Sequence, residues 1–431
     1  MIKILFYILI AYLPFQIALN PYSDIDLMSG RVLILALFFY WLWTIRGSFK
    51  AKIRRFLNFQ SILLLTLLFF AFISLLFAKE VFWGIRKILV FCSIFPLYFL
   101  TVDIIKEADG IKKVFKILVF SSLPIAIIGI LQFFAQFVFL PGEITNFWTR
   151  WISPIFYGRA FGWLVSLNPS WIFEMGGRFY IRAISIFPDP HTFAFYLGFI
   201  IPLALGLLIF TRENRKLLLA TILILFAALF STFSRGGYFA MLGTFIFFAL
   251  LFIFRRSLKI SKQYKILLFA VCCLLFVVCL APFSPVSRCF YSSFDFSRYS
   301  NVERLKIWGE ALDSISLHPW FGVGIGNFPK TVDPWAKYLS PINAHSAYLD
   351  IASEMGIFAL WFWLCLFLGT IFFLVKSPLN FVSFGLAGSL VWFSVHALVE
   401  TSIYNPTILA ILMVILGLST IAIKQFNNRT I

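Results

Sequence analysis

The feature that most constrains this chain is a series of apolar runs, each about as long as a helix that crosses a bilayer, which is about 20 residues. Hydrophobic residues make up 61% of the sequence and charged residues 13%, whereas a soluble domain of this length needs a far larger polar share. We therefore predict an all-α integral membrane protein that forms one polytopic domain over residues 1–431. The expected transmembrane helices, about twelve, lie at 2–19, 31–46, 60–78, 88–105, 114–139, 192–211, 217–233, 238–254, 266–283, 356–375, 380–398 and 406–423.

The basic residues predict the orientation of these helices. The first run resembles a signal peptide, but no small-residue cleavage site precedes NPYSD, and we expect the run to remain as a helix. Lys and Arg concentrate in alternate loops such as RGSFKAKIRR, KEADGIKKVFK and TRENRK, which the positive-inside rule places in the cytoplasm. Both termini are then cytoplasmic, and the protein is a multi-pass protein of the cytoplasmic (inner) membrane. The net charge of +18 follows from this topology and gives no reason to expect nucleic acid as a partner.

Two long loops, 140–191 and 284–355, lie on the outer face in this topology. Cys289 is the one cysteine outside the apolar runs and the basic loops, so no disulfide framework is available there. Polar residues gather in these loops, and we expect the catalytic motifs in the second. Because ATP and nucleotide sugars are scarce outside the cytoplasm, an enzyme there needs a donor that is already activated and carried by a lipid.

The tight outer connection Ser234-Arg235-Gly236-Gly237 contains an arginine, although the positive-inside rule disfavours basic residues on the outer face. Arginine at membrane depth costs on the order of 3 kcal/mol, so its presence calls for an explanation. One reading is a side chain that snorkels to the interface. The other is an anion ligand, because the guanidinium keeps its charge and donates two parallel hydrogen bonds to phosphate. Arg182, in FYIRAISIF, is a second outer arginine near the membrane.

The second long loop contains a predicted helix, SNVERLKIWGEALDSISLHP. Ser300 is the expected N-cap with Glu303 as its capping-box partner, and the helix ends near Leu317. Arg304 and Trp308 fall on one face of it. This face either rests on the membrane with Trp308 among the headgroups, or directs Arg304 toward a phosphate.

Three glycines alternate in the next motif, HPWFGVGIGNFP, at Gly322, Gly324 and Gly326. The motif does not indicate a dinucleotide site, since such a site requires a strand before the motif and a helix after it. The glycines bring the backbone close to a phosphate or serve only as turns.

The four histidines differ in what their surroundings indicate. His345, in NAHSAYLD, lies at the outer mouth of an apolar run, where a neutral imidazole can accept a proton from a sugar hydroxyl or simply cap the helix. His191 is either a catalytic residue or part of a structural stretch, because capping of the following helix by Asp189 is the commoner use of a sequence such as PDPH. His396 reads as a packing or hydrogen-bonding residue and His318 as a helix stop. The outer loops hold no HxH, HExxH or DxD pattern, so we expect no metal and no cofactor.

The order of these motifs resembles the O-antigen ligase and O-antigen polymerase family over residues of about 180–400: SRGG, then NVERLKIWGEAL, HPWFGVGIGNF and AHSAYLDIASEMGIFAL. The resemblance implies a C-type glycosyltransferase-like membrane fold and a metal-independent, inverting glycosyl transfer in the synthesis of lipopolysaccharide or another polysaccharide of the cell envelope. It also implies a glycan donor on undecaprenyl diphosphate and an acceptor that is lipid-anchored or a glycan.

The resemblance assigns roles residue by residue. His345 matches the catalytic histidine, and Arg235 and Arg304 match positions that bind the donor diphosphate around one anion. Arg182 is a third candidate and Arg288 a fourth. Ser346 departs from the pattern, in which asparagine is commoner. Supporting positions are Trp308, Gly324 and Glu354.

Three functions remain open at this point. A ligase transfers the glycan to an acceptor hydroxyl, and a polymerase uses a second lipid-linked repeat unit as the acceptor. A flippase or other transporter of lipid-linked oligosaccharides belongs to a different class. Transport predicts polar residues within the membrane core and broken helices at matching places in two halves, whereas here the polar residues cluster on one face.

Overall fold

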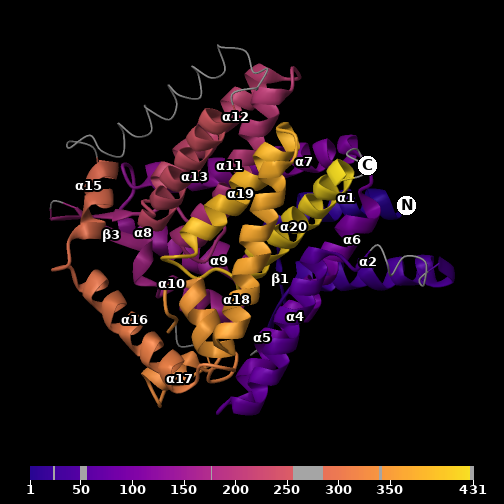
Figure 1. Cartoon of the computed structure of the whole chain (residues 1–431). Helices are drawn as coiled ribbons and strands as arrows, with labels where there is room; N and C mark the ends of the chain where they lie inside the picture. Colours follow the sequence, from indigo (N-terminus) through magenta and orange to yellow (C-terminus); the bar gives the residue numbers. More distant parts are fainter. Residues whose placement is uncertain (23–24, 49–55, 176, 256–284, 339–341, 428–431) are drawn as a thin grey trace.

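The computed structural model describes residues 1–22, 25–48, 56–175, 177–255, 285–338 and 342–427. It is a largely helical assembly (Figure 1). The predicted segment 266–283 lies outside the described residues, and every other predicted segment coincides with a helix or a pair of helices. These helices are α1 (Ile2–Tyr12), α2 (Ser29–Ile45), α4 (Phe59–Ser74), α5 (Val81–Ile94), α6 (Pro96–Ile104), α7 (Ala108–Ala135), α11 (Pro190–Phe210), α12 (Arg215–Ser231), α13 (Arg235–Phe254), α18 (Ala347–Lys376), α19 (Phe381–His396) and α20 (Pro406–Asn427).

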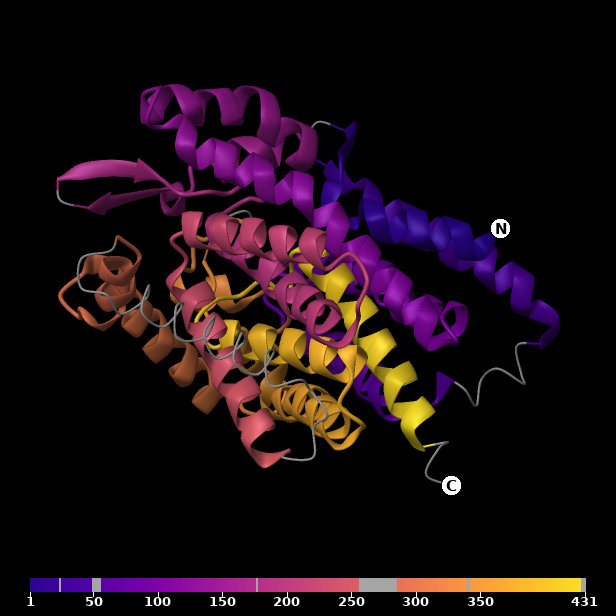
Figure 2. The same cartoon turned by 90° about the horizontal axis from the view of Figure 1, so that it is seen from above.

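Among the described residues, seven helical segments have the length and composition to cross a membrane, and three shorter helical segments are apolar. The chain is therefore a multi-pass membrane protein, and twelve crossings stay a prediction. The two termini lie on the same side of the molecule in Figures 1 and 2. α11 and α20 form the centre, because 89% and 83% of their apolar windows are buried, against 33% to 61% in the other five. α11 packs against α19, α12 and α7, and α20 packs against α6, α19 and α18.

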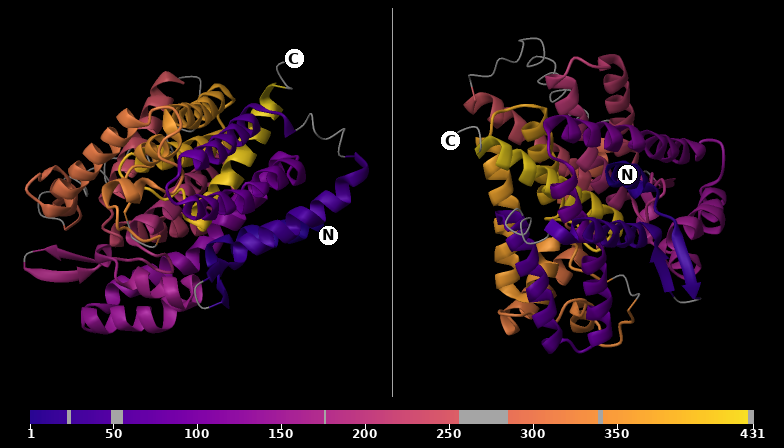
Figure 3. Two further views of the ribbon diagram at one scale, coloured as in Figure 1. Left: turned by 90° about the horizontal axis from the view of Figure 1, so that it is seen from below. Right: turned by 90° about the vertical axis from the view of Figure 1, so that its right-hand side faces the viewer.

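The first long loop folds into α8 (Pro141–Phe147), α9 (Ser153–Tyr157) and α10 (Arg159–Ser166), followed by the antiparallel strands β3 (Ile172–Met175) and β4 (Arg178–Ile181). This β3–β4 hairpin projects from the helices in Figure 2. A second hairpin, β1 (Ala18–Tyr22) with β2 (Ile25–Met28), contacts α9 and is visible in the right panel of Figure 3. These hairpins are an exception to the predicted all-α fold.

The second long loop forms α15 (Pro285–Tyr291), α16 (Tyr299–Leu317) and α17 (Phe328–Val332). The predicted end of α16 at Leu317 is confirmed, with His318 as the C-cap. The predicted N-cap is wrong: α16 begins one residue before Ser300, and its N-cap Arg298 makes no side-chain capping bond. The backbone turn at Arg298 starts the helix, so the Ser300 hydroxyl is free to bind a side chain instead.

Helix α18 is kinked at Gly356, and the motif that contains Gly322 and Gly324 packs against this kink. Gly356 has a φ of 87°, outside the helical region, so the N–H of Ile357 bonds to the carbonyl of Pro319 at 2.8 Å. The carbonyl of Glu354 accepts from the N–H of Gly324 at 3.1 Å. A Cβ on Gly324 would lie 2.6 Å from Cα of Ala78, which no side chain tolerates. The glycines therefore allow close backbone packing against α18 and α4–α5, which favours the turn reading of this motif.

Candidate active site

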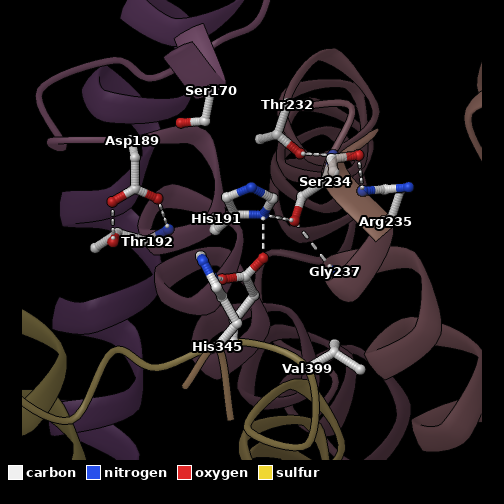
Figure 4. A network of polar contacts seen from close by, with 12 residues as sticks. Ser170, Asp189, His191, Thr192, Thr232, Ser234, Arg235, Gly237, His345 and Val399 are labelled. Carbon is white, nitrogen blue, oxygen red and sulfur yellow. Dashed lines mark hydrogen bonds and ion pairs between the residues drawn. The ribbon is translucent and has the colours of Figure 1, made fainter. Parts of the chain in front are cut away.

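The candidate site lies where α11, α13, α16 and α18 meet the segment 397–405, which joins α19 to α20. Figure 4 shows His191 between Ser234 and His345, each from a different part of the chain. These parts of the chain lie together because their helices pack through apolar side chains, which brings a few polar groups together at one end of the helices.

A buried carboxylate, Glu400, is the centre of this site, with 7% of its surface exposed. Its Oε1 pairs with Nη2 of Arg304 and lies 3.3 Å from Nδ1 of His191. Its Oε2 lies 3.4 Å from Nδ1 of His345. Burial by itself raises the pKa of Glu400, but Arg304, His191 and His345 together outweigh it and hold the pKa well below its usual value. Glu400 is therefore an ionised carboxylate at neutral pH.

His345 is held in an unusual backbone conformation, with a φ of 47°. Its N–H donates to Oδ1 of Asn343 at 2.8 Å, while the preceding carbonyl of Ala344 accepts from Nε1 of Trp308 at 2.9 Å. A left-handed conformation costs a non-glycine residue about 1–3 kcal/mol, so these contacts maintain it. Helix α18 begins after N-cap Ser346, and the His345 imidazole points to Glu400. The capping alternative for His345 is thereby excluded.

The two predicted diphosphate ligands have different partners. Nη1 of Arg304 donates to the carbonyl of Val399 at 2.6 Å, in addition to the Glu400 pair. Nη1 of Arg235 donates to Oδ1 of Asn301 at 2.8 Å, and Nη2 lies 3.4 Å from Oγ of Ser300. Asn301 and Arg304 are one turn apart on α16, so both guanidinium groups border the same stretch of that helix. Arg235, unlike Arg304, has no carboxylate partner among the described residues.

Arg182 and Arg288 occupy opposite environments. Arg182 is buried, and its guanidinium donates to the carbonyls of Thr232 at 2.9 Å, Phe233 at 2.8 Å and Ser170 at 3.1 Å. Burial lowers the pKa of Arg182 from its usual value. These bonds fix the turn that precedes Ser234 and Arg235. Arg288 is exposed on α15, and no described residue bonds to its side chain.

Glu354 belongs to a neighbouring ionic cluster. Its carboxylate lies 3.0 Å from Nζ of Lys87 and accepts from the hydroxyl of Tyr404 at 2.6 Å. Between the two clusters, Thr401 donates to the buried carboxylate of Asp350. The segment 397–405 thus connects Glu354 with the Glu400 site.

The contacts of His191 and His396 indicate what these two histidines do in the fold. Asp189 caps α11 by accepting from the N–H of Thr192 at 2.8 Å, as predicted. His191 nevertheless faces the site, because its Nδ1 also lies 3.0 Å from Oγ of Ser234. His396 is a packing residue, as predicted, and stacks on Phe195 with ring centroids 3.7 Å apart.

Sequence reasoning missed Glu400, the residue that unites the site. A signal was present: Glu400 is the one acidic residue between Phe381 and Asn427, and it stands between two apolar segments. A lone carboxylate at such a position is costly unless it is paired, which makes it a candidate functional residue.

Comparison with known proteins agrees with the motifs. Residues 219–364 match the model of the O-antigen ligase family. This range contains Arg235, Arg304 and His345, and it ends before Glu400. A search of curated proteins finds no match to the chain. The similarity to the O-antigen ligase family is therefore to residues 219–364, the part of the chain that carries Arg235, Arg304 and His345.

Proposed function

We propose that this protein is an O-antigen ligase-type glycosyltransferase that moves a glycan from undecaprenyl diphosphate to an acceptor hydroxyl at the outer face of the cytoplasmic membrane. The family match supports a membrane enzyme of the ligase or polymerase type. The observation that carries the reaction is the position of Glu400 between His345 and Arg304.

His345 is the general base of the proposed reaction. Glu400 is ionised, so the hydrogen bond at 3.4 Å requires the proton on Nδ1 of His345. The lone pair is then on Nε2, which makes no bond to a described residue. The His345 side chain is 32% exposed, so Nε2 is open to a substrate. Nε2 accepts the proton of the acceptor hydroxyl, and Glu400 stabilises the imidazolium that forms.

Arg235 is the principal ligand of the donor diphosphate. It is bound by neutral groups, so its positive charge is not cancelled by a carboxylate of the protein. Arg304 borders the same stretch of α16, but its charge is paired with Glu400, so it positions that carboxylate. Fixed cations that face the departing diphosphate stabilise the charge that develops on it, without a metal.

The proposed step is a single displacement at the anomeric carbon. The acceptor oxygen forms the new bond to this carbon as its proton passes to His345, and the bond from carbon to the diphosphate oxygen breaks. The electron pair leaves with undecaprenyl diphosphate. Attack from the face opposite the leaving group inverts the anomeric configuration.

The test uses purified protein in detergent with EDTA and a lipid-diphosphate oligosaccharide, with and without a second lipid-anchored acceptor. We expect the wild type to form product, and His345→Ala to be at least about 100-fold slower. His318→Ala is the matched control, because His318 is an exposed histidine of the same outer loop. Product that requires the added acceptor supports a ligase, and a ladder without it supports the polymerase alternative. Equal rates for His345→Ala and the wild type would refute the proposal, as would a wild type that only moves the lipid across a vesicle membrane.

A further inference from the structure

A second group of outer-face cations lies apart from Glu400, at the ends of α2 and α5. Arg31 is three residues into α2, and Arg86 is on the first turns of α5. Both stand on the face where the predicted topology disfavours positive charge. Neither is part of the residues 219–364 that match the ligase family.

Both arginines lie against one face of α5. Arg86 lies over the ring of Tyr338, with 4.6 Å from Cζ to the ring centroid. Nε of Arg31 donates to Oγ of Ser93 at 2.8 Å, and Nη2 donates to the carbonyl of Leu89 at 3.1 Å. Leu89 and Ser93 lie three and seven residues after Arg86 on α5. All three residues therefore share one face of this helix.

These two positive charges are uncompensated, unlike their neighbours. Lys87, next to Arg86, is paired with Glu354 at 3.0 Å, and Lys330 lies 3.7 Å from a carboxylate oxygen of Glu80. Within the described ranges, no ion pair involves Arg31 or Arg86. Arg31 is half-buried, and its contacts leave Nη1 without a protein partner among these residues. Such a pair of arginines matches the bidentate geometry of phosphate.

The surface beside the arginines is apolar. Phe82, Ile85 and Leu89 on α5 are exposed, at 77%, 37% and 54%. In a membrane helix, exposed apolar side chains of this kind face lipid. The complementary ligand therefore combines a phosphate with a hydrocarbon tail, which is the chemistry of a phosphorylated lipid in the outer leaflet.

We propose that Arg31 and Arg86 bind the phosphate of the lipid-anchored acceptor, while its glycan extends toward His345. The identity of this lipid as the acceptor rests on the proposed function. Tyr338 and His345 belong to the same connection between α17 and α18, so the connection that carries the catalytic histidine also carries the ring that Arg86 covers. The donor diphosphate has its own ligand in Arg235, and two separate sites keep the two lipids apart.

The test measures binding, which needs no transfer. Native mass spectrometry of the purified protein counts bound undecaprenyl monophosphate, and a titration gives its affinity. We expect two bound lipids for the wild type. Arg31→Gln/Arg86→Gln loses one of them with at least a tenfold weaker affinity, and Arg235→Gln loses the other. Arg178→Gln is the matched control, because Arg178 is an exposed arginine of the β3–β4 hairpin.

Two further probes identify the ligand chemistry. Undecaprenol, which lacks the phosphate, should not fill the site, and inorganic phosphate should not compete at equal concentration. Arg31→Lys/Arg86→Lys retains both charges, and we expect it to bind better than the glutamine variant, which excludes a folding defect as the cause. Wild-type stoichiometry in the glutamine variant, equal binding of undecaprenol, or equal competition by inorganic phosphate would overturn the proposal. If binding behaves as expected but the wild type transfers no glycan, the lipid site stands and the proposed function fails.

Discussion

Nδ1 of His345 lies 3.4 Å from one carboxylate oxygen of Glu400, and Arg304 pairs with the other oxygen. One anion thereby orients the candidate base and holds a cation beside it. The arrangement differs from that expected from sequence, in which Arg304 is a free ligand for diphosphate. It makes Arg304 a residue that positions Glu400, and Arg235 the arginine that is available to the donor.

Replacing Glu400 tests its action through His345. Glu400→Gln keeps the size of the side chain but removes the charge that stabilises an imidazolium, so we expect the turnover number to fall by about 100-fold or more, with little change in the KM for the donor. The pH–rate profile should also shift, which a purely structural role would not produce. Glu303→Gln removes an exposed carboxylate one residue before Arg304 and should leave the rate unchanged. A turnover number close to that of the wild type would contradict the assigned role.

The depressed pKa of Glu400 predicts how its contribution to stability depends on pH. Because the folded pKa lies well below the ordinary value of about 4.5, the contribution is fully present above that value and is lost as the pH falls through the folded pKa. The difference in unfolding free energy between the wild type and Glu400→Gln should therefore be constant above about pH 5.5 and shrink in strong acid. Thermal unfolding in detergent over a pH series measures it. A change centred between pH 6 and 7 would show that another group is responsible.

Substitutions at Arg182 and Arg235 should affect different properties, the stability of the fold at Arg182 and the binding of the donor at Arg235. Arg182→Gln removes a buried cation that donates to three carbonyls, so we expect a loss of about 3 kcal/mol or more in stability, together with lower activity. Arg235→Gln should unfold within a few degrees of the wild type yet lose donor binding. Unfolding temperatures and the affinity for the lipid-diphosphate donor provide the comparison. A destabilised Arg235→Gln together with an Arg182→Gln that is stable but does not bind the donor would contradict both assigned roles.

Trp308 supports the left-handed conformation of His345 through the bond from its Nε1 to the carbonyl of Ala344. Trp308→Phe keeps most of the packing but removes this donor, a change worth about 1 kcal/mol, so we expect activity to fall by roughly fivefold to tenfold. Trp320→Phe is the control, since Trp320 is 58% exposed in the same long connection between α13 and α18. Unchanged activity in Trp308→Phe would favour the reading in which Trp308 serves only as a membrane-interface residue.

The sequence by itself determined the local features of this protein. A membrane helix follows from a continuous apolar run, so the helical segments among the described residues were predictable. Short-range chemistry likewise placed Asp189 as the cap of α11 and His318 as the end of α16. The cap at Ser300 was mispredicted, because several starts are compatible with one local pattern, and a difference of one residue decides which side chain can cap.

Only the tertiary structure decided which polar groups meet. Glu400 is separated by 55 residues from His345 and by 96 from Arg304, and neither spacing follows from a helical or strand period. The contacts arise because α11, α13, α18 and α19 pack through apolar surfaces and leave these polar groups facing one another at one end of the helices. A charge at that place must find an opposite charge within the fold, since the membrane cannot solvate it. Sequence therefore identified His345 and the arginines as candidates, and packing selected Glu400 as the group that joins them.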